Sequence, residues 1–254
     1  MYANYHTHTY LCNHAVGTME EYVQEAIKND LKILGFSDHC PYPFSVEYDS
    51  WMRMSLSETK IYVNEVLRLK EKYKDSIQIL LGYEAEYYPK EFDKMLEFIR
   101  QFPCDYLILG QHNTHNEYDG CHMYADVPEE EFIQYVSQVI EGMKTGVYSY
   151  LAHPDYVGYR ENLDLYRKEM TRLCKTAKEL QIPLEFNLLG FREKRPYPFE
   201  EFWEIVAQEG NDVILGCDAH SAVYVGQKNI EEQAKAYLSS LGITPIEQLK
   251  LNKV

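Results

Sequence analysis

The chain has 254 residues, 45% of them hydrophobic, with 40 acidic against 25 basic side chains and a net charge of −15. This length is enough for one large core, and single α/β barrels commonly have about 250 residues. The acidic balance disfavours nucleic-acid binding, and no stretch approaches the roughly 18 uncharged apolar residues of a membrane span. We therefore expect one domain over residues 1–254 that binds neither nucleic acid nor membrane.

Short apolar runs alternate with amphipathic segments along the whole chain. Thr18 and Glu21 have the spacing of a capping box, which predicts the start of a helix. Ser55 and Glu58 repeat this spacing further along the chain. In chain order we expect a strand over 3–7, a helix from Thr18, a strand over 32–37, a helix from Ser55, a strand over 76–84, a helix over 90–101, a strand over 105–110, a helix over 129–144, a strand over 148–153, a helix whose inner face holds Leu173, Ala177 and Leu180, a strand over 182–187, a helix over 199–209, a strand over 212–216 and a helix over 228–240.

Seven strand-then-helix units of this kind predict a parallel sheet with helices outside it. The sheet could be open and doubly wound, or closed into a barrel. Each predicted strand runs into a histidine or a carboxylate, except the sixth, which ends in Asn187. A closed barrel gathers all strand ends on one rim, whereas an open sheet spreads them along a line, so this distribution favours the barrel.

The spacing of these polar residues points to bound metal. His6 and His8 are two apart on a strand, so both side chains leave the same face, and Asp218 and His220 repeat that geometry near the other end of the chain. A barrel would bring the two pairs side by side. Imidazoles with carboxylates suit Zn, Mn or Fe, and eight or nine ligands suggest two or three divalent ions, with a carboxylate such as Glu84 bridging them.

Several residues near the predicted rim are compatible with more than one role. Asp38 points away from its neighbour His39 on a strand, so it could hold a ligand imidazole instead of a metal. Thiolate ligation by Cys12, Cys40 or Cys217 is possible, although nitrogen and oxygen ligands already suffice. The start MYANYHTHTY is not a signal peptide, and the six cysteines form no C-x-x-C pair. We therefore expect a cytoplasmic protein with reduced thiols.

The polar motifs follow one another along nearly the full chain: HTH at 6–8, His14, SDH at 37–39, GYEAEY at 82–87, LGQH at 109–112, AHPD at 152–155 and GCDAHS at 216–221. In this order they resemble the polymerase and histidinol phosphatase (PHP) family, and within it most of all the stand-alone histidinol-phosphate phosphatases. The resemblance implies a distorted (β/α)7 TIM-like barrel with a trinuclear metal site. It implies that one ion takes His6, His8, Glu84 and Asp218, that a second shares Glu84 and adds His112 and His153, and that a third takes His14, His39 and His220.

The resemblance also implies an activity, the hydrolysis of L-histidinol phosphate to L-histidinol and phosphate in histidine biosynthesis. We expect a metal-bound hydroxide, held by Glu84, Asp218, His112 and His153, to attack phosphorus in line. The phosphate of this small substrate needs cationic partners besides the metals. Arg192, after the sixth predicted strand, is the first candidate, and Arg160, in the loop after AHPD, is the second.

Other functions remain open at this point. A second phosphoesterase activity, toward phosphotyrosine or another small phosphomonoester, fits the same ligands, whereas the acidic charge argues against a 3′–5′ nuclease. A non-catalytic, regulatory metal-binding module would show a broken ligand set, and here the set is complete. The serines lack a G-x-S-x-G context, and no glycine-rich phosphate loop is present, so we expect neither serine-hydrolase nor nucleotide-loop chemistry.

Overall fold

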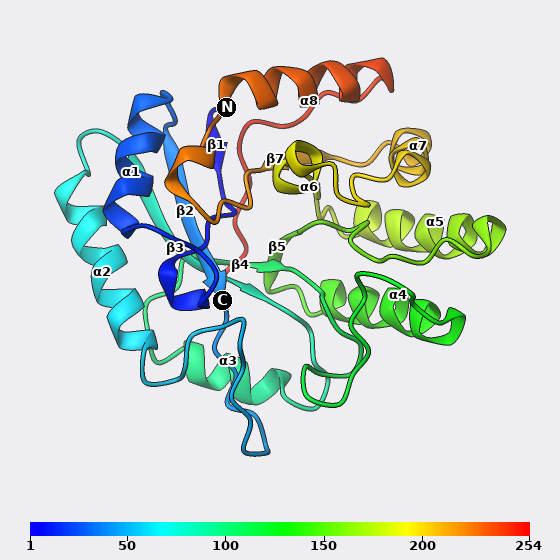
Figure 1. The fold of residues 1–254 in the computed structure, drawn as a ribbon, viewed down its shortest axis with the longest axis horizontal. Helices are drawn as coiled ribbons and strands as arrows, with labels where there is room; N and C mark the ends of the chain where they lie inside the picture. Colours follow the sequence, from blue (N-terminus) through cyan, green and yellow to red (C-terminus); the bar gives the residue numbers. More distant parts are fainter.

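The computed structural model describes all 254 residues, and its centre is a sheet of seven parallel strands in the order β1 to β7 (Figure 1). The strands are β1 (Ala3–Asn4), β2 (Ile33–His39), β3 (Gln78–Ala85), β4 (Tyr106–Leu109), β5 (Tyr148–Leu151), β6 (Leu184–Asn187) and β7 (Val213–Gly216). At least one helix lies between each strand and the next, so strands that follow in sequence are neighbours in the sheet. The alternation predicted from the sequence is confirmed.

The sheet closes between its first and last strands, beyond the ends of β1 and β7. Thr7 and Ala219 form a parallel bridge there. The amide of His8 donates to the carbonyl of Ala219 at 3.0 Å, and the amide of Ala219 donates to the carbonyl of His6 at 3.3 Å. The closure is therefore short and irregular, which makes the structure a distorted, nearly closed barrel.

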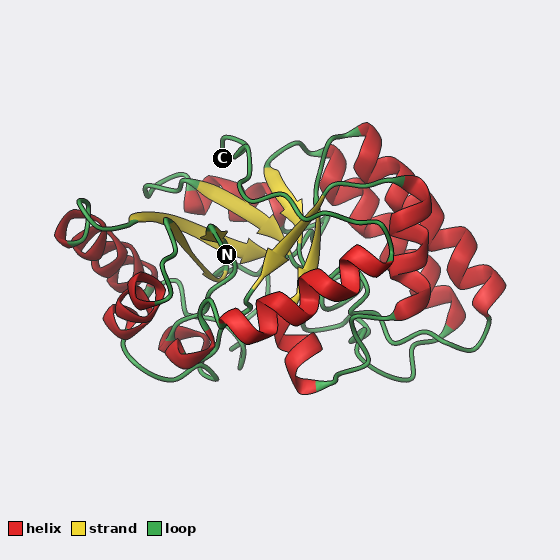
Figure 2. Cartoon of the chain, turned by 90° about the horizontal axis from the view of Figure 1, so that it is seen from above, coloured by secondary structure: helices red, strands yellow, loops and turns green.

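Helices cover the outside of the strands (Figures 1 and 2). They are α1 (Met19–Lys28), α2 (Thr59–Lys72), α3 (Phe92–Ile99), α4 (Glu129–Lys144), α5 (Leu163–Glu179), α6 (Leu188–Glu193), α7 (Glu200–Glu209) and α8 (Lys228–Ser240). The capping box of Thr18 and Glu21 forms as predicted, with both reciprocal hydrogen bonds. None of these helices is long and apolar enough to cross a membrane.

Two details of the predicted helices are wrong. The helix expected from Ser55 begins at Thr59, because the Ser55 hydroxyl donates to the Glu58 carboxylate at 2.7 Å in the preceding turn and leaves no cap for the helix. Leu180 lies just beyond the end of α5 and is exposed rather than facing the core, since the chain turns there through a positive φ at Gln181. The short helix α6 was not predicted.

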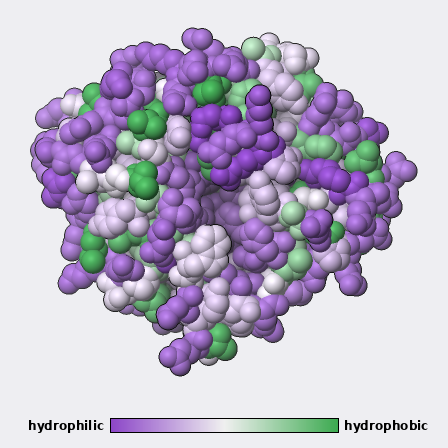
Figure 3. Space-filling model, viewed as in Figure 1, coloured by the Kyte–Doolittle hydropathy of each residue, from purple (hydrophilic) through white to green (hydrophobic).

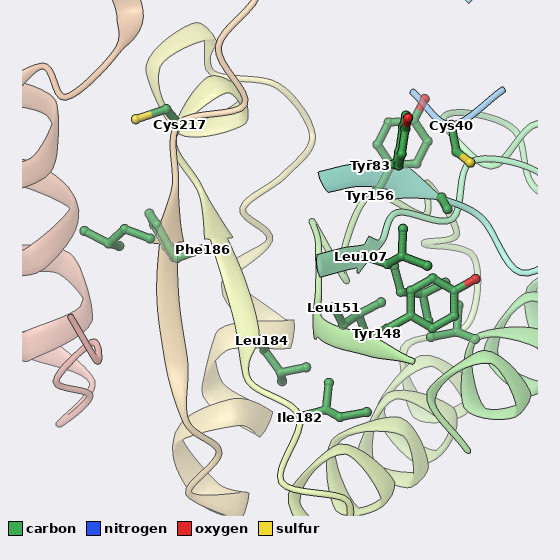
Figure 4. Packing of buried hydrophobic residues seen from close by; sticks show 14 of the residues in the cluster. Cys40, Tyr83, Leu107, Tyr148, Leu151, Tyr156, Ile182, Leu184, Phe186 and Cys217 are labelled. Atoms are coloured by element: carbon green, nitrogen blue, oxygen red, sulfur yellow. The ribbon is translucent and has the colours of Figure 1, made fainter. Parts of the chain in front are cut away.

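Two apolar clusters pack against the barrel wall, one outside it and one inside it. One lies between strands and helices, where Leu107, Tyr148 and Leu151 pack together (Figure 4). The other fills the barrel interior, because alternate residues of each strand point inward. Within it the Tyr106 hydroxyl donates to the carbonyl of Tyr5 at 2.7 Å. The interior below the rim is therefore packed, and polar side chains gather at the carboxyl ends of the strands.

Candidate metal centre

The strand ends bring all nine predicted ligands to the same rim of the barrel. Seven of them are buried, whereas His220 is half-buried and His14 is exposed. The nine residues are His6, His8, His14, His39, Glu84, His112, His153, Asp218 and His220. Buried histidines and carboxylates of this cluster form several groups whose ligand atoms lie within 4.8 Å of one another.

Glu84, near the end of β3, lies at the centre of this cluster. Its Oε1 lies 2.7 Å from Nε2 of His153. Its Oε2 lies 3.1 Å from Nδ1 of His39, 3.5 Å from Nε2 of His8 and 3.6 Å from Nε2 of His6. Oε2 is buried and has no hydrogen-bond partner. A carboxylate with one orphaned oxygen among several imidazoles fits a bridging metal ligand.

Asp218 joins the two ends of the chain within the cluster. Its Oδ1 lies 3.1 Å from Nε2 of His8, 3.6 Å from Nε2 of His6 and 3.4 Å from Nδ1 of His220. The two short pairs predicted from the sequence therefore meet. The ring of His14 stacks on that of His220 with 4.7 Å between their centroids, at the outer edge of the cluster.

The protonation of the cluster favours a bound cation. Burial raises the pKa of Glu84, but His39, His6 and His112 outweigh it and hold the pKa well below the usual range. Burial lowers the pKa of His39 to about 4. Burial also disfavours charge on His8, but the neighbouring carboxylates raise its pKa to about 9. Several buried carboxylates therefore share this cluster with imidazoles, an arrangement whose negative charge a divalent ion would balance.

Three further buried carboxylates lie behind the ligand imidazoles and face the ring nitrogen away from the cluster. Such partners fix the orientation of a ligand histidine and the nitrogen that it presents to the metal. The pairs are Asp38 Oδ1 with His8 Nδ1 at 3.5 Å, Glu86 Oε1 with His112 Nδ1 at 3.0 Å, and Glu185 Oε1 with His6 Nδ1 at 2.8 Å. Asp38 thus lies behind an imidazole, as its place in the sequence suggested, and the imidazole is that of His8.

Two glycines make room for these carboxylates. A Cβ on Gly110 would lie 1.9 Å from Oε1 of Glu84, and a Cβ on Gly216 would lie 1.7 Å from Oε1 of Glu185. Two of the predicted ligands themselves have a positive φ, 27° at His153 and 45° at Asp218. Strained backbone of this kind persists where the surrounding structure holds it, and it is concentrated at functional sites.

The cysteines near the rim are poor ligand candidates. All six cysteines are free thiols, as predicted. Burial raises the pKa of Cys217 to about 12 and raises that of Cys12 further. Because the thiolate is the form that binds metal, protonated thiols leave ligation to the nitrogen and oxygen atoms.

A cavity of about 290 Å³ opens above the cluster. The surface in Figure 3 is hollowed near its centre, among hydrophilic side chains. Six of the predicted histidine ligands, together with Glu84 and Asp218, form part of the cavity wall. The other lining residues are Trp51, Met52, His122, Tyr156, Leu189, Glu193, Arg195, Tyr197 and Tyr224.

Residues 4–189 match the sequence profile of the PHP domain. The chain belongs to the PHP family. A probable histidinol-phosphatase of Deinococcus radiodurans is 28% identical over 228 residues, which cover 87% of each chain. The crystal structure of a PHP relative, histidinol phosphate phosphatase from Lactococcus lactis complexed with zinc, L-histidinol and phosphate, has a TM-score of 0.72 at 21% identity over 98% of both chains.

A more distant structure, of the metal-dependent tyrosine phosphatases YwqE from Bacillus subtilis and CpsB from Streptococcus pneumoniae, has a TM-score of 0.54 at 15% identity and covers 99% of this chain and 98% of that chain. At these identities the two structures establish the fold alone. Together with the strand order, they confirm the distorted (β/α)7 PHP barrel. The relationship to histidinol-phosphate phosphatases predicted from the motifs is confirmed as well.

The structure of this PHP protein does not place either predicted substrate-binding arginine in the cavity wall. The Arg160 guanidinium lies 3.7 Å from the centroid of the Phe199 ring and donates to the carbonyls of Val157 and Tyr159 at 2.8 and 2.7 Å. Arg192 stacks on Tyr224, with 3.7 Å between its Cζ and the ring centroid.

Arg195, which the sequence reasoning missed, does line the cavity. Its Nη2 lies 2.7 Å from the Glu193 carboxylate, and its Nη1 donates to the Tyr197 hydroxyl at 3.2 Å. Both Arg192 and Arg195 belong to the FREKR segment. Because α6 ends between them, the direction of the chain after Lys194 decides which of the two side chains faces the cavity.

Proposed function

We propose that this PHP protein is a metal-dependent phosphomonoesterase that converts L-histidinol phosphate and water into L-histidinol and phosphate. The observation that carries the proposal is the placement of Glu84, with its orphaned oxygen, among imidazoles under an open cavity. The relatives from Deinococcus radiodurans and Lactococcus lactis support this choice of substrate class. A location in the cytoplasm is part of the proposal, supported by the six free thiols.

The donor set fits two or three divalent ions of zinc, manganese or iron. We assign the ions as the family resemblance implies. One ion is held by His6, His8, Glu84 and Asp218, and a second by Glu84, His112 and His153. A third ion is held by His14, His39 and His220. When bound, such ions bind phosphoryl oxygens as Lewis acids and lower the pKa of a coordinated water, in a site held by Glu84, Asp218, His112 and His153.

In this proposal, residues of the chain orient the metal ligands and bind the phosphate of the substrate. Asp38, Glu86 and Glu185 hold the ligand imidazoles in register, so that little reorganisation accompanies catalysis. Arg195 supplies a fixed positive charge in the cavity wall, where a guanidinium can bind phosphate oxygens in pairs. Arg192 and Arg160 stay predictions as phosphate ligands, and their stacking on aromatic rings favours a supporting role.

A panel of substrates tests the proposal. The purified chain, with zinc or manganese added back, is assayed on L-histidinol phosphate, phosphotyrosine and p-nitrophenyl phosphate. We expect kcat/KM to be at least about 100-fold higher for L-histidinol phosphate than for p-nitrophenyl phosphate, a difference of about 2.7 kcal/mol. Equal kcat/KM values for all substrates would indicate a general phosphomonoesterase, and a higher kcat/KM for phosphotyrosine would indicate a tyrosine phosphatase activity. No hydrolysis by a metal-loaded chain would favour the non-catalytic module.

A further inference from the structure

Trp51 stands out on the wall of the metal cavity. This residue is 66% exposed, whereas the other tryptophan, Trp203, is fully buried. Its indole lies 5.9 Å from the ring of His14, centroid to centroid, at an angle of 47°. Trp51 therefore stands next to the outermost predicted ligand and leaves much of its surface uncovered beside the cavity.

The loop that carries Trp51 is anchored by buried charges. Arg53, two residues further on, is buried and lies 3.0 Å from Glu86 and 2.7 Å from Glu117. It also donates to the carbonyl of Cys40 at 2.7 Å. Breaking a buried ion pair of this kind leaves an uncompensated charge, so these contacts anchor the backbone beside Trp51. The exposed indole therefore projects from an anchored segment.

The neighbours of Trp51 strengthen this conclusion. Met52 and Met54 are buried, at 6% and 2% exposure, so the backbone packs against the body of the protein on both sides of Arg53. Of the four residues 51–54, Trp51 alone turns outward. It adds an exposed indole to a cavity whose other lining residues include histidines, tyrosines and the Glu193–Arg195 pair.

We propose that Trp51 binds the leaving group of the substrate and selects for a flat ring, such as an imidazole or a phenol. This inference rests on the proposed function. With a phosphate held at the metal cluster and Arg195, the rest of the substrate would extend toward solvent along the cavity wall that contains His14 and the exposed indole. Indole faces favour stacked rings and cations over aliphatic chains, and a tryptophan, with only two side-chain torsions, loses little conformational entropy on binding.

Three variants test the proposal: Trp51→Ala, Trp51→Phe, and Val46→Ala as a control on the same loop. Val46 is 47% exposed but lies outside the metal cavity. Binding of L-histidinol in the presence of inorganic phosphate is measured by calorimetry on the metal-loaded chain, with serinol as an amino alcohol that lacks a ring. Intrinsic fluorescence follows Trp51 directly, because the buried Trp203 is shielded from added ligand.

We expect Trp51→Ala to weaken histidinol binding roughly 5- to 20-fold, with serinol and phosphate binding unchanged. Trp51→Phe should restore most of the affinity, and Val46→Ala should leave it at the wild-type value. Equal losses for histidinol and serinol, or no loss for either, would overturn the role of Trp51. Selective loss of histidinol binding in a chain that hydrolyses no phosphoester would support this role while refuting the proposed function.

Discussion

Glu185, inside β6, lies 2.8 Å from Nδ1 of His6, although 179 residues separate the two in the sequence. Both side chains are fully buried. The other oxygen of Glu185 accepts a hydrogen bond from the amide of His153 at 3.0 Å. One carboxylate therefore orients a predicted ligand that follows the first strand and holds the backbone of a predicted ligand that follows the fifth. The sixth strand, which supplies no predicted ligand, takes part in the site in this way.

Glu185→Gln removes the negative charge. It also places a hydrogen-bond donor, the glutamine amide, near the His6 ring nitrogen and the His153 amide, which donate hydrogen bonds to the carboxylate. Because partners of this kind set ligand basicity and orientation, we expect metal affinity at the His6 site to fall about 10- to 100-fold. Competition with a chelating dye measures the affinity, and circular dichroism checks the fold. Glu161→Gln, at an exposed position, is the matched control. Equal metal affinity in both variants would show that Glu185 has only a structural role.

The sequence predicted the ligands of this site better than their supports. Polar residues at strand ends follow from the geometry of a parallel barrel, so periodicity and residue type predicted that the candidate ligands His6, His153 and Asp218 lie at one rim. Glu185 stands inside an apolar strand, IPLEFN, where its side chain could have faced a helix or the barrel axis. A single charge within a buried strand was the available signal. Its partner, however, depends on the closure between β1 and β7, which no local pattern specifies.

The arginines show a second limit of sequence reasoning. Arg192 and Arg195 are three residues apart, and Lys194 between them adopts a left-handed conformation that ends α6. That turn sends Arg195 into the cavity wall and leaves Arg192 stacked on Tyr224. The strand order and most helix bounds depend on local periodicity and were predictable, whereas the direction of a side chain after an irregular turn depends on tertiary packing.

Arg195→Ala removes the positive charge that faces the cavity. We expect KM for a phosphomonoester to rise about 10- to 100-fold and inhibition by inorganic phosphate to weaken in parallel, since a charged hydrogen bond contributes about 1.5–3 kcal/mol. Metal content should be unchanged. Steady-state kinetics on Arg192→Ala gives the comparison, for which we expect a change of less than about threefold. A larger rise in KM for Arg192→Ala than for Arg195→Ala would instead identify Arg192 as the phosphate ligand.

Gly216→Ala introduces a methyl group where Glu185 leaves no space, with 1.7 Å to its Oε1. Neither group can move freely, because Glu185 is held by His6 and by the backbone of the rim. We expect a loss of about 1–3 kcal/mol in the free energy of unfolding and weaker metal binding. Gly146→Ala, with open space around its Cβ but a φ of 76°, should cost only about 1 kcal/mol and leave metal binding intact. Denaturant unfolding measures both.

Glu20 on α1 ties this helix to α2 and its end through Lys72, Arg68 and Tyr73. Hydrogen bonds from Lys72, Tyr73 and Arg68, in that order, lower its pKa to about 2. A depressed carboxyl pKa adds stability above its unfolded value near 4.5, and this contribution disappears as the pH falls toward 2. Glu20→Gln should therefore have a slightly lower Tm than the wild type at pH 7 and the same Tm near pH 2. The difference should also become smaller in 1 M salt, because Glu20 and its partners are partly exposed to solvent. A Tm difference that persists at pH 2 would contradict the ion-pair origin.

Removal of metal should destabilise the whole barrel, because ligands from both ends of the chain share the cluster around Glu84 and Asp218. Ions that bind only the folded chain stabilise it by about 2.7 kcal/mol at a concentration of 100 Kd, which corresponds to roughly 5–10 °C in Tm for a chain of this size. We expect a chelator to lower the Tm by this amount and added zinc or manganese to restore it. Glu84→Gln, which loses the carboxylate that we propose as the bridge, should respond to neither treatment. A wild-type Tm that is the same with and without metal would mean that the cluster is held together by its own protons and hydrogen bonds, and would remove the structural basis for a multi-ion site.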